Sequence, residues 1–313
     1  MEKIVFASNN ANKLKEIREL LPEYEILTLK DVGFNSDIEE TGTTFLANAY
    51  IKSKTVYEYL KSQSNPMPVM ADDSGLCVTA LEGAPGIYSA RYASTTNKNA
   101  QDSENRKKLL AELEGVVNRK ANFSCAVVLY VNENDIHFGT GKTCGEISYA
   151  ESGNLAFGYD PIFYSYDLEE KFSEVSDEEK NSVSHRARAI ADLFQRNHKL
   201  TTMKLRPEYF ESLVSGEKTI EVRLNDEKRK SLKSGDFIVF TNTEDGEIAL
   251  AMVTNLKTFS SFESCVCFTG TRKIGFNGYL PSDTIEEYRK IYTREQEQKY
   301  GVLAIELKLL KAD

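Results

Sequence analysis

The stretch VMADDSG, residues 69–75, places two adjacent carboxylates directly after a short apolar run. Val69–Ala71 has the apolar and β-branched composition of a strand, and Asp72–Asp73–Ser74–Gly75 is typical of the loop that ends one. Ligand sites of α/β sheets lie beyond the carboxyl ends of their strands. The stretch therefore predicts an α/β domain whose sheet carries an acidic site.

The flanking sequence alternates between strand and helix patterns, and two later runs predict a hairpin. An α/β fold with a mixed rather than purely parallel central sheet, flanked by helices, is therefore expected. The expected elements are a strand at Lys3–Ala7, helices at Lys13–Leu21 and Phe45–Leu60, with Thr43 or Thr44 as the N-cap of the second, and hairpin strands at Phe123–Val131 and Ile136–Thr140.

The pattern changes near residues 196–203, where helix spacing gives way to short β-like runs separated by turns. This change predicts two domains, at residues 1–199 and 200–313. The strands expected in the second domain are Ile220–Leu224, Phe237–Thr241, Ile248–Leu256 and Val302–Leu307.

Composition excludes several classes of protein. The 313 residues are 41% apolar and 28% charged, as in ordinary globular chains, and no apolar run approaches the roughly 18 residues of a membrane span. We therefore expect a cytoplasmic protein with no membrane partner. Five cysteines without CxxC pairing argue against a disulfide framework or a zinc site, so any metal is expected to be a hard cation held by carboxylates.

The negative charge is concentrated in the first domain. The net charge of −9 divides into −8 for residues 1–199 and −1 for residues 200–313. A general nucleic-acid binder carries a basic footprint instead. The distribution suits a site for Mg²⁺ and a small phosphorylated molecule, and it equally suits an ordinary acidic surface.

Three loops are candidates for the site. The first, Ser8, Asn9, Asn10, Ala11, Asn12 and Lys13, offers backbone N–H groups and a lysine at a helix N-terminus, either as an anion cradle or as a simple N-capping turn. The other two, Glu39–Gly42 and Asp72–Gly75, are acidic. Together their carboxylates could hold Mg²⁺, or raise one another's proton affinity and supply a general base.

Two later segments could recognise a purine. Phe157, Gly158, Tyr159 and Asp160 combine aromatic rings for stacking with an acceptor for hydrogen bonds, or form a tight turn with core aromatics. After Lys180, Ser184 is expected to cap a helix whose first residues are His185 and Arg186, close to the backbone donors of its N-terminus.

The ordered motifs SNNANK, EETGTTFLANA, ADDSGLCVTALEGAPGIYSARYA, FGYDPIF and EEKNSVSHRARA resemble those of the inosine triphosphate pyrophosphatase family over residues 1–197. The resemblance implies hydrolysis of ITP, dITP and XTP to the monophosphate and pyrophosphate with Mg²⁺, and a homodimer. It places Ser8 to Lys13 on the substrate phosphates, Glu39 and Asp73 on the metal, Asp73 also on the proton acceptor, and Asp72 beside the metal without a firm role. It places Ser74, Phe157 to Asp160, Lys180, His185 and Arg186 on the nucleotide.

Two departures from the family pattern are visible. Asn12 stands where many members have glycine, and Leu155–Ala156 replaces a glycine pair. Neither change removes a charge or a ligand, so activity is still expected.

The segment from Met203 to Phe240 resembles an ASCH domain, a small PUA-like β-barrel, and the resemblance extends over residues 201–310. It implies a cleft for RNA or a nucleotide-like ligand, with Lys218, Thr219, Glu221 and Arg223 as candidate lining residues. Some ASCH relatives hydrolyse acetylated cytidine with a lysine, a threonine and a glutamate, but Glu221 stands where the threonine is expected. A solvated strand face and an RNA contact at the basic segment 228–233 are the alternatives.

An enzyme of nucleotide metabolism is the first functional hypothesis. The alternative is a protein that binds or modifies RNA or nucleosides, in which the first domain mainly recognises modified nucleotides. A scavenger of modified pyrimidine triphosphates is a third.

Overall fold

The computed structural model describes residues 2–96, 99–153 and 157–310 and divides the chain into two compact units. The first unit ends at Asn197 and the second begins at His198, close to the expected domain boundary. No helix among the described residues has the length and apolar content needed to cross a bilayer.

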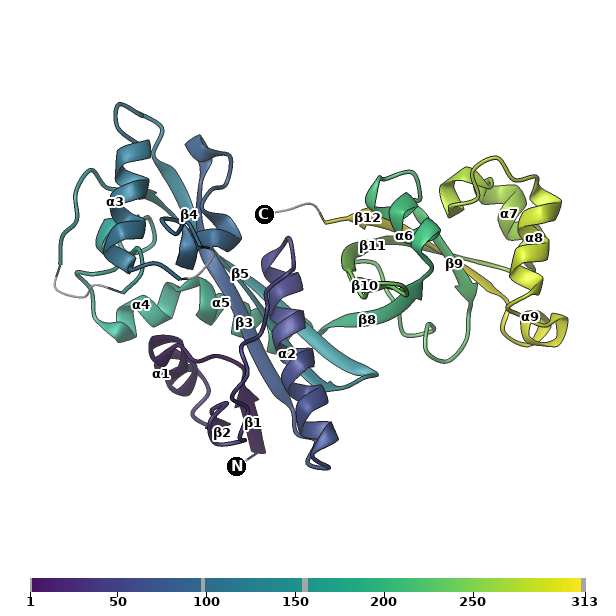
Figure 1. The fold of residues 1–313 in the computed structure, drawn as a ribbon, viewed down its shortest axis with the longest axis horizontal. Coiled ribbons are helices and arrows are strands. Elements are labelled where there is room, and N and C mark those ends of the chain that lie inside the picture. Colours follow the sequence, from purple (N-terminus) through teal and green to yellow (C-terminus); the bar gives the residue numbers. More distant parts are fainter. Residues whose placement is uncertain (1, 97–98, 154–156, 311–313) are drawn as a thin grey trace. The chain divides into compact units, whose positions relative to one another are not determined.

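The first unit has a mixed sheet with the strand order β2-β1-β3-β4-β5, and β6 and β7 extend it beyond β5. β1 runs parallel to β2 and β3, whereas β3, β4 and β5 are antiparallel. Helix α2 packs on β3 and β4, and α5 packs on β4 and β5 (Figure 1). The predicted mixed α/β fold is confirmed.

The strands of this unit are β1 (Glu2–Phe6), β2 (Tyr24–Leu27), β3 (Val69–Val78), β4 (Lys120–Asn132), β5 (Asp135–Ile147), β6 (Phe163–Ser165) and β7 (Glu170–Lys171). Its α-helices are α1 (Ala11–Leu20), α2 (Phe45–Ser62), α3 (Asp102–Glu112), α4 (Asp177–Val183) and α5 (His185–Arg196). Thr44 and Ser184 cap α2 and α5 through their side chains, as predicted.

Strand β3 corrects one prediction, because Asp72 and Asp73 lie inside it and not in a loop after it. The strand continues to Val78, and the two aspartates pair with Val127 and Ala126 of β4. The neighbour on the other side, β1, pairs with β3 only as far as Met70. Because β1 ends there, one edge of β3 is open beside the two carboxylates. The apolar pattern of the sequence could not show whether Asp72 and Asp73 belong to the strand or to a loop after it.

Two glycines of β5 allow α5 to approach the sheet. A Cβ at Gly141 would lie 2.0 Å from the carbonyl oxygen of His185, and one at Gly139 would lie 2.2 Å from that of Ala189. The segment that contains them, GTGKT, therefore forms a strand under a helix. This close packing fixes the N-terminus of α5, where His185 and Arg186 lie.

The second unit has a five-stranded sheet in the order β8-β10-β11-β12-β9. β8 and β10 are parallel and the other pairs are antiparallel. The terminal strands approach closely enough for Arg223 of β9 to donate to the carbonyl oxygen of Lys204 on β8 at 3.0 Å. This curvature is consistent with the small barrel expected from the resemblance.

The strands of the second unit are β8 (His198–Leu205), β9 (Ile220–Leu224), β10 (Phe237–Asn242), β11 (Ile248–Phe259) and β12 (Val302–Leu309). Its α-helices are α6 (Pro207–Val214), α7 (Phe262–Thr269), α8 (Pro281–Arg289) and α9 (Arg294–Tyr300).

Candidate active site

A cavity of about 850 Å³ in the first unit brings most of the predicted site residues together. Its walls combine a polar turn, acidic side chains and an aromatic segment. Ala11 and Asn12 are not part of its lining; both are exposed in the first turn of α1. The predicted residues that line it are Ser8, Asn9, Asn10, Lys13, Glu39, Asp73, Ser74, Phe157, Gly158, Tyr159, Asp160, Lys180, His185 and Arg186.

The polar turn before α1 is held by its own side chains. Asn10 caps the helix by accepting hydrogen bonds from the backbone N–H groups of Asn12 and Lys13, and Ser8 Oγ accepts one from the N–H of Asn10. The N-capping interpretation is therefore confirmed, and it directs the Lys13 ammonium to Asp72 at 3.0 Å. A helix N-terminus with a lysine beside it also retains the donors that an anion needs.

Asp72 is held as a buried, fully charged anchor. Its carboxylate lies 3.0 Å from Lys13 and 3.1 Å from Arg186 of α5. Burial alone would raise its pKa, but the charges of Lys13, Arg186 and Lys52 outweigh burial and hold the pKa of Asp72 well below its usual range. Asp72 therefore positions cations instead of exchanging protons.

Asp73 has a different environment, because successive side chains of a strand point to opposite faces of the sheet. It faces α2, where Asn48 donates to its Oδ2 at 3.0 Å and Lys52 lies 3.3 Å from its Oδ1. Burial raises the pKa of Asp73; the charge of Lys52 opposes this shift and the charge of Glu40 adds to it. A carboxylate with a raised pKa is suited to accept a proton.

The acidic loop before α2 contributes Glu40 most directly. Lys52 donates to Glu40 Oε1 at 2.7 Å, so one ammonium joins Glu40 and Asp73. Arg91 lies 3.4 Å from the other oxygen of Glu40. Glu39, the predicted ligand, lines the cavity but its side chain is exposed. Among the described residues the ion pairs of this loop are thus made by Glu40, and the predicted role of Glu39 as a metal ligand stays a prediction.

The segment Phe157–Asp160 forms another part of the wall. Asp160 accepts from Lys180 at 2.8 Å, and the ammonium of Lys180 lies 5.4 Å from the ring centre of Phe157. Lys180 also contacts Glu16 of α1 at 3.2 Å, and Glu16 pairs with Arg186. Tyr159 is buried in the core, as the second interpretation predicts, and Phe157 borders the cavity, so its stacking on a base stays a prediction.

His185 is buried and neutral. Burial, with the charges of Arg186 and Lys180, lowers its pKa well below the usual value. Its ring stacks on Phe123 with ring centres 4.9 Å apart. Its Nδ1 is buried and has no hydrogen-bond partner among the described residues.

The second unit contains a separate cleft of about 150 Å³. Lys218, Glu221 and Arg223 line it together with the rings of Tyr209 and Tyr288. The predicted lining residue Thr219 is exposed outside it. The cleft is walled by buried groups, so the alternative of a solvated strand face is wrong for Glu221, which is 2% exposed.

The charges in this cleft are paired with one another. Glu221 lies 3.0 Å from the Lys218 ammonium and 2.9 Å from the guanidinium of Arg223. Lys218 donates in addition to the carbonyl oxygens of Ile220 and Ile274, at 3.1 and 2.8 Å. Burial outweighs the charge of Glu221 and lowers the pKa of Lys218. Two protons of a charged Lys218 are thus directed to backbone carbonyl oxygens, and the ion pair with Glu221 accompanies them.

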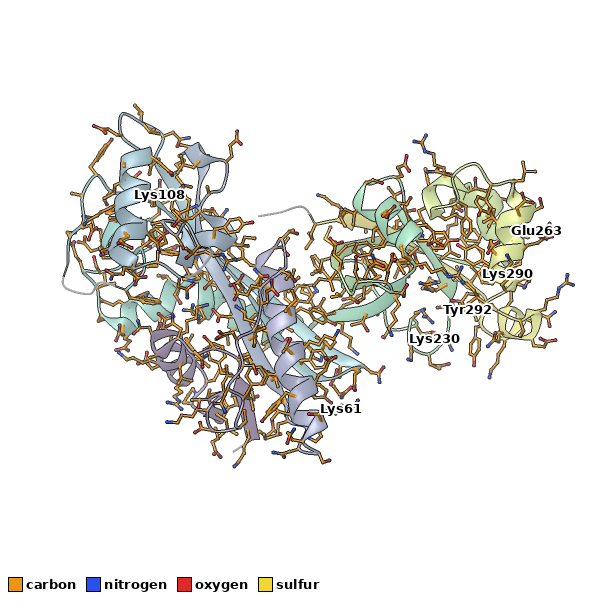
Figure 2. All side chains as sticks on the ribbon, viewed as in Figure 1. Lys61, Lys108, Lys230, Glu263, Lys290 and Tyr292 are labelled. Carbon is orange, nitrogen blue, oxygen red and sulfur yellow. The ribbon has the colours of Figure 1, made fainter. Side chains whose placement is uncertain are left out.

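Two of the four basic residues of the segment 228–233 are paired with carboxylates. Arg229 pairs with Asp226, and Lys230, in the loop after β9 (Figure 2), donates to Glu227 at 2.6 Å. Ion pairs within the loop reduce the positive field that RNA phosphates require.

Comparison with known proteins identifies both units. The model of the Ham1 family matches residues 4–196. The chain belongs to the Ham1 family. The ASCH domain model matches residues 203–311, so the predicted fusion of the two domains is confirmed.

The relatives of the Ham1 domain are close in sequence. A protein of Treponema denticola named dITP/XTP pyrophosphatase is 47% identical over 189 residues, which are 60% of this chain and 94% of the relative. One of Clostridium perfringens with the same name is 46% identical over 198 residues, 62% of this chain and 96% of the relative. The structure of the Staphylococcus aureus Ham1 protein matches with a TM-score of 0.55 and 38% identity, over 63% of this chain and all of that one. These matches confirm that the chain is an enzyme of the hydrolase class.

Several residues of the Ham1 domain site were not predicted. These residues lie on helical segments, where polar and charged side chains look like ordinary surface residues in the sequence: Glu16, Asn48, Lys52 and Arg91. Glu39 and Glu40 are adjacent in the sequence, so the spacing of the motif does not show which of the two carboxylates contacts Lys52. Leu155 and Ala156, one of the two expected departures, lie outside the described residues.

Proposed function

We propose that the Ham1 domain hydrolyses the triphosphates of non-standard purines, namely ITP, dITP and XTP, to the monophosphate and pyrophosphate. The names of its relatives support this proposal. The observation that carries it is the cavity in which Asp73 and Glu40 share Lys52 while Lys13 and the capped turn of α1 offer donors to phosphate. The aromatic segment of the same cavity suits a flat base.

Mg²⁺ is the cofactor that the donor set fits. Two carboxylates that already share one cation, the Lys52 ammonium, supply the oxygen ligands that a hard divalent ion requires together with substrate phosphates. Glu40 and Asp73 would hold the ion. When bound, it would neutralise charge on the phosphate oxygens.

Different residues of the cavity act in the separate steps of the reaction. A water molecule attacks the α-phosphorus and gives its proton to Asp73, whose raised pKa favours proton uptake and whose carboxylate is oriented by Asn48. The bond from the α-phosphorus to the bridging oxygen breaks, and pyrophosphate leaves with that oxygen. Lys13 and the polar turn before α1, which line the cavity, stabilise the departing charge.

Base selection is assigned to the other wall of the cavity. The base stacks on Phe157, and Asp160, His185 and Arg186 are the polar residues of the lining that could meet its edge. A 6-oxo purine and adenine present opposite hydrogen-bonding groups at position 6. A mismatch that leaves buried polar groups unpaired discriminates strongly, so adenine is disfavoured.

A triphosphate panel tests this function. The intact chain is incubated with ITP, dITP, XTP, ATP and GTP and Mg²⁺, and pyrophosphate and orthophosphate are counted separately. Pyrophosphate release from the first three, with little from ATP, is expected. Orthophosphate as the product, or no turnover of ITP, dITP or XTP, would reject the proposal, and a preference for modified pyrimidine triphosphates would replace it.

We further propose that the ASCH domain binds a nucleoside-sized ligand and not an extended RNA. The cleft is small and partly aromatic, with Tyr209, Phe276 and Tyr288 in its wall, and Arg229 and Lys230 of the neighbouring basic loop are paired with carboxylates. Binding of nucleosides that is insensitive to salt is expected. Tight binding of structured RNA that weakens steeply with salt would contradict it. The homodimer and the cytoplasmic location stay predictions.

A further inference from the structure

Helix α3 holds both backbone polar groups of one residue, Gly158, in the base-binding wall. Asp102 Oδ2 accepts a hydrogen bond from the N–H of Gly158 at 2.8 Å, and Arg106 Nη1 donates to the carbonyl oxygen of Gly158 at 2.7 Å. Residues four apart on a helix lie on the same face, so the two side chains form one clamp. Neither residue belongs to the motifs that predicted the site.

Gly158 is the point at which this wall is most easily deformed. Its φ of +54° lies in the left-handed region, and a glycine has no side chain to restrict it. The following residues are fixed independently, because Tyr159 donates to the carbonyl oxygen of Ser89 at 2.9 Å and Asp160 is held by Lys180. The position of Phe157 therefore depends on how the Gly158 backbone is held, together with the hydrogen bond from the Asp160 N–H to the Phe157 carbonyl oxygen at 3.1 Å.

Arg106, the cationic residue of the clamp, is held in place by a second partner. The Arg106 side chain is 5% exposed, and its Nη2 lies 3.0 Å from Glu151 Oε2. Hydrogen bonds from an ionised donor are shorter and stronger than neutral ones. Arg106 is thus immobilised by two partners, and the Gly158 carbonyl is one of them.

Asn105, which directly precedes Arg106 on α3, contacts a second segment of the cavity wall. Asn105 accepts from the N–H of Ala93 at 2.8 Å and donates to the carbonyl oxygen of Ala90 at 3.2 Å. These two backbone groups flank Arg91, which contacts Glu40. One face of α3 consequently fixes both the base wall and the segment that supports the acidic loop.

We propose that Asp102 and Arg106 are positioning residues for base selectivity. They act through Gly158, by fixing the ring of Phe157 at the distance and tilt at which a purine stacks. This inference rests on the proposed function, since it concerns the same cavity and substrate. Neither side chain is required for the transfer of a proton or for the binding of the phosphate tail.

The test compares Asp102→Ala and Arg106→Ala with two controls on the same helix, Glu104→Ala and Lys107→Ala, which remove exposed charges of the same sign. KM and kcat are measured for ITP and GTP. Inorganic tripolyphosphate, which has a tail and no base, is used as an inhibitor. Asp102→Asn retains an acceptor and serves as the conservative variant.

We expect each alanine variant of the clamp to raise KM for ITP by about 10-fold, with a smaller change in kcat, because a charge-assisted hydrogen bond is lost. The ratio of kcat/KM for ITP to that for GTP should fall, whereas the inhibition constant of tripolyphosphate should stay within about 2-fold, because the phosphate contacts are untouched. Asp102→Asn should restore the ratio, and both control variants should resemble the wild type.

Two results would overturn the inference. An unchanged ratio in active clamp variants would show that the clamp does not influence the base. A rise of the tripolyphosphate constant equal to the rise in KM would indicate general damage to the cavity. Absence of ITP turnover by the wild type would instead reject the proposed function, and this inference with it.

Discussion

The two domains each bury a network of charges, and the networks differ in what they leave available. In the Ham1 domain, carboxylates and cations surround a cavity of about 850 Å³, and His185 Nδ1 has no partner among the described residues. In the ASCH domain, Glu221 forms ion pairs with Lys218 and Arg223, and Lys218 also donates to two backbone carbonyl oxygens, around a cleft of about 150 Å³.

The comparison shows that a buried ion pair is not by itself a sign of catalysis. A buried pair whose partners satisfy each other mainly maintains the fold, and its net contribution to stability is small. A reactive site needs groups whose charge or hydrogen-bonding capacity is left for the substrate. We therefore expect substitutions in the first network to change turnover and substitutions in the second to change stability.

The largest effect is expected for Asp73→Asn. Loss of the proton acceptor should reduce pyrophosphate release from ITP by about 1000-fold, within the range of general acid–base catalysis. Inhibition by tripolyphosphate should persist. Asp72→Asn is the matched control on the opposite face of β3, and we expect it to raise KM and lower stability more than it lowers kcat. Equal losses of kcat in both variants would contradict the different roles of these neighbours.

The next effect tests the ASCH network. Lys218→Met leaves Glu221 buried with one partner fewer and should lower the free energy of unfolding of this domain by about 3 kcal/mol, the usual scale for a broken buried pair. Calorimetry measures this change, and turnover of ITP should be unaffected. The double substitution Lys218→Met/Glu221→Leu should recover most of the loss. A fall in ITP turnover in Lys218→Met would contradict the expectation that this network does not influence the activity of the Ham1 domain.

A third experiment distinguishes Glu40 from Glu39. Glu40→Gln should lower activity at limiting Mg²⁺ by about 100-fold, the scale at which changes around a metal site reduce affinity, and excess Mg²⁺ should restore part of it. Glu39→Gln should resemble the wild type. A titration of both variants with Mg²⁺ measures this difference. A larger loss of activity for Glu39→Gln than for Glu40→Gln would support Glu39 as the ligand, as the sequence predicts.

The smallest effect concerns pH. Because burial depresses the pKa of His185, the unfolded chain binds a proton near pH 6.5 that the folded chain excludes. The free energy of unfolding should therefore rise with pH up to about 6.5 and then level off, with a contribution of at most about 1.4 kcal/mol per pH unit. Urea unfolding at several pH values measures the free energy of unfolding, and its increase with pH should be smaller for His185→Gln than for the wild type. Equal slopes would mean that His185 is charged in the folded protein.

Much of the fold was predictable because it follows from local patterns. The strands at residues 220–224 and 237–241, and the caps Thr44 and Ser184, are set by alternation of side chains and by capping chemistry. The family motifs located most of the cavity lining. The error at Asp72 and Asp73 arose because charged residues inside a strand look like the end of that strand.

What the sequence alone determined is the type of each local element and the set of polar residues available for chemistry. Tertiary structure decided which of them meet. Only the pairing of β3 with β4 sends Asp72 to Lys13 and Arg186 and sends Asp73 to Lys52. Only the packing of the helices brings Glu40, and not Glu39, to the same lysine, and places Asp102 and Arg106 on Gly158. The physical reason is that the pKa and the role of a charged group depend on burial and on neighbours distant in the chain, which spacing along the sequence does not specify.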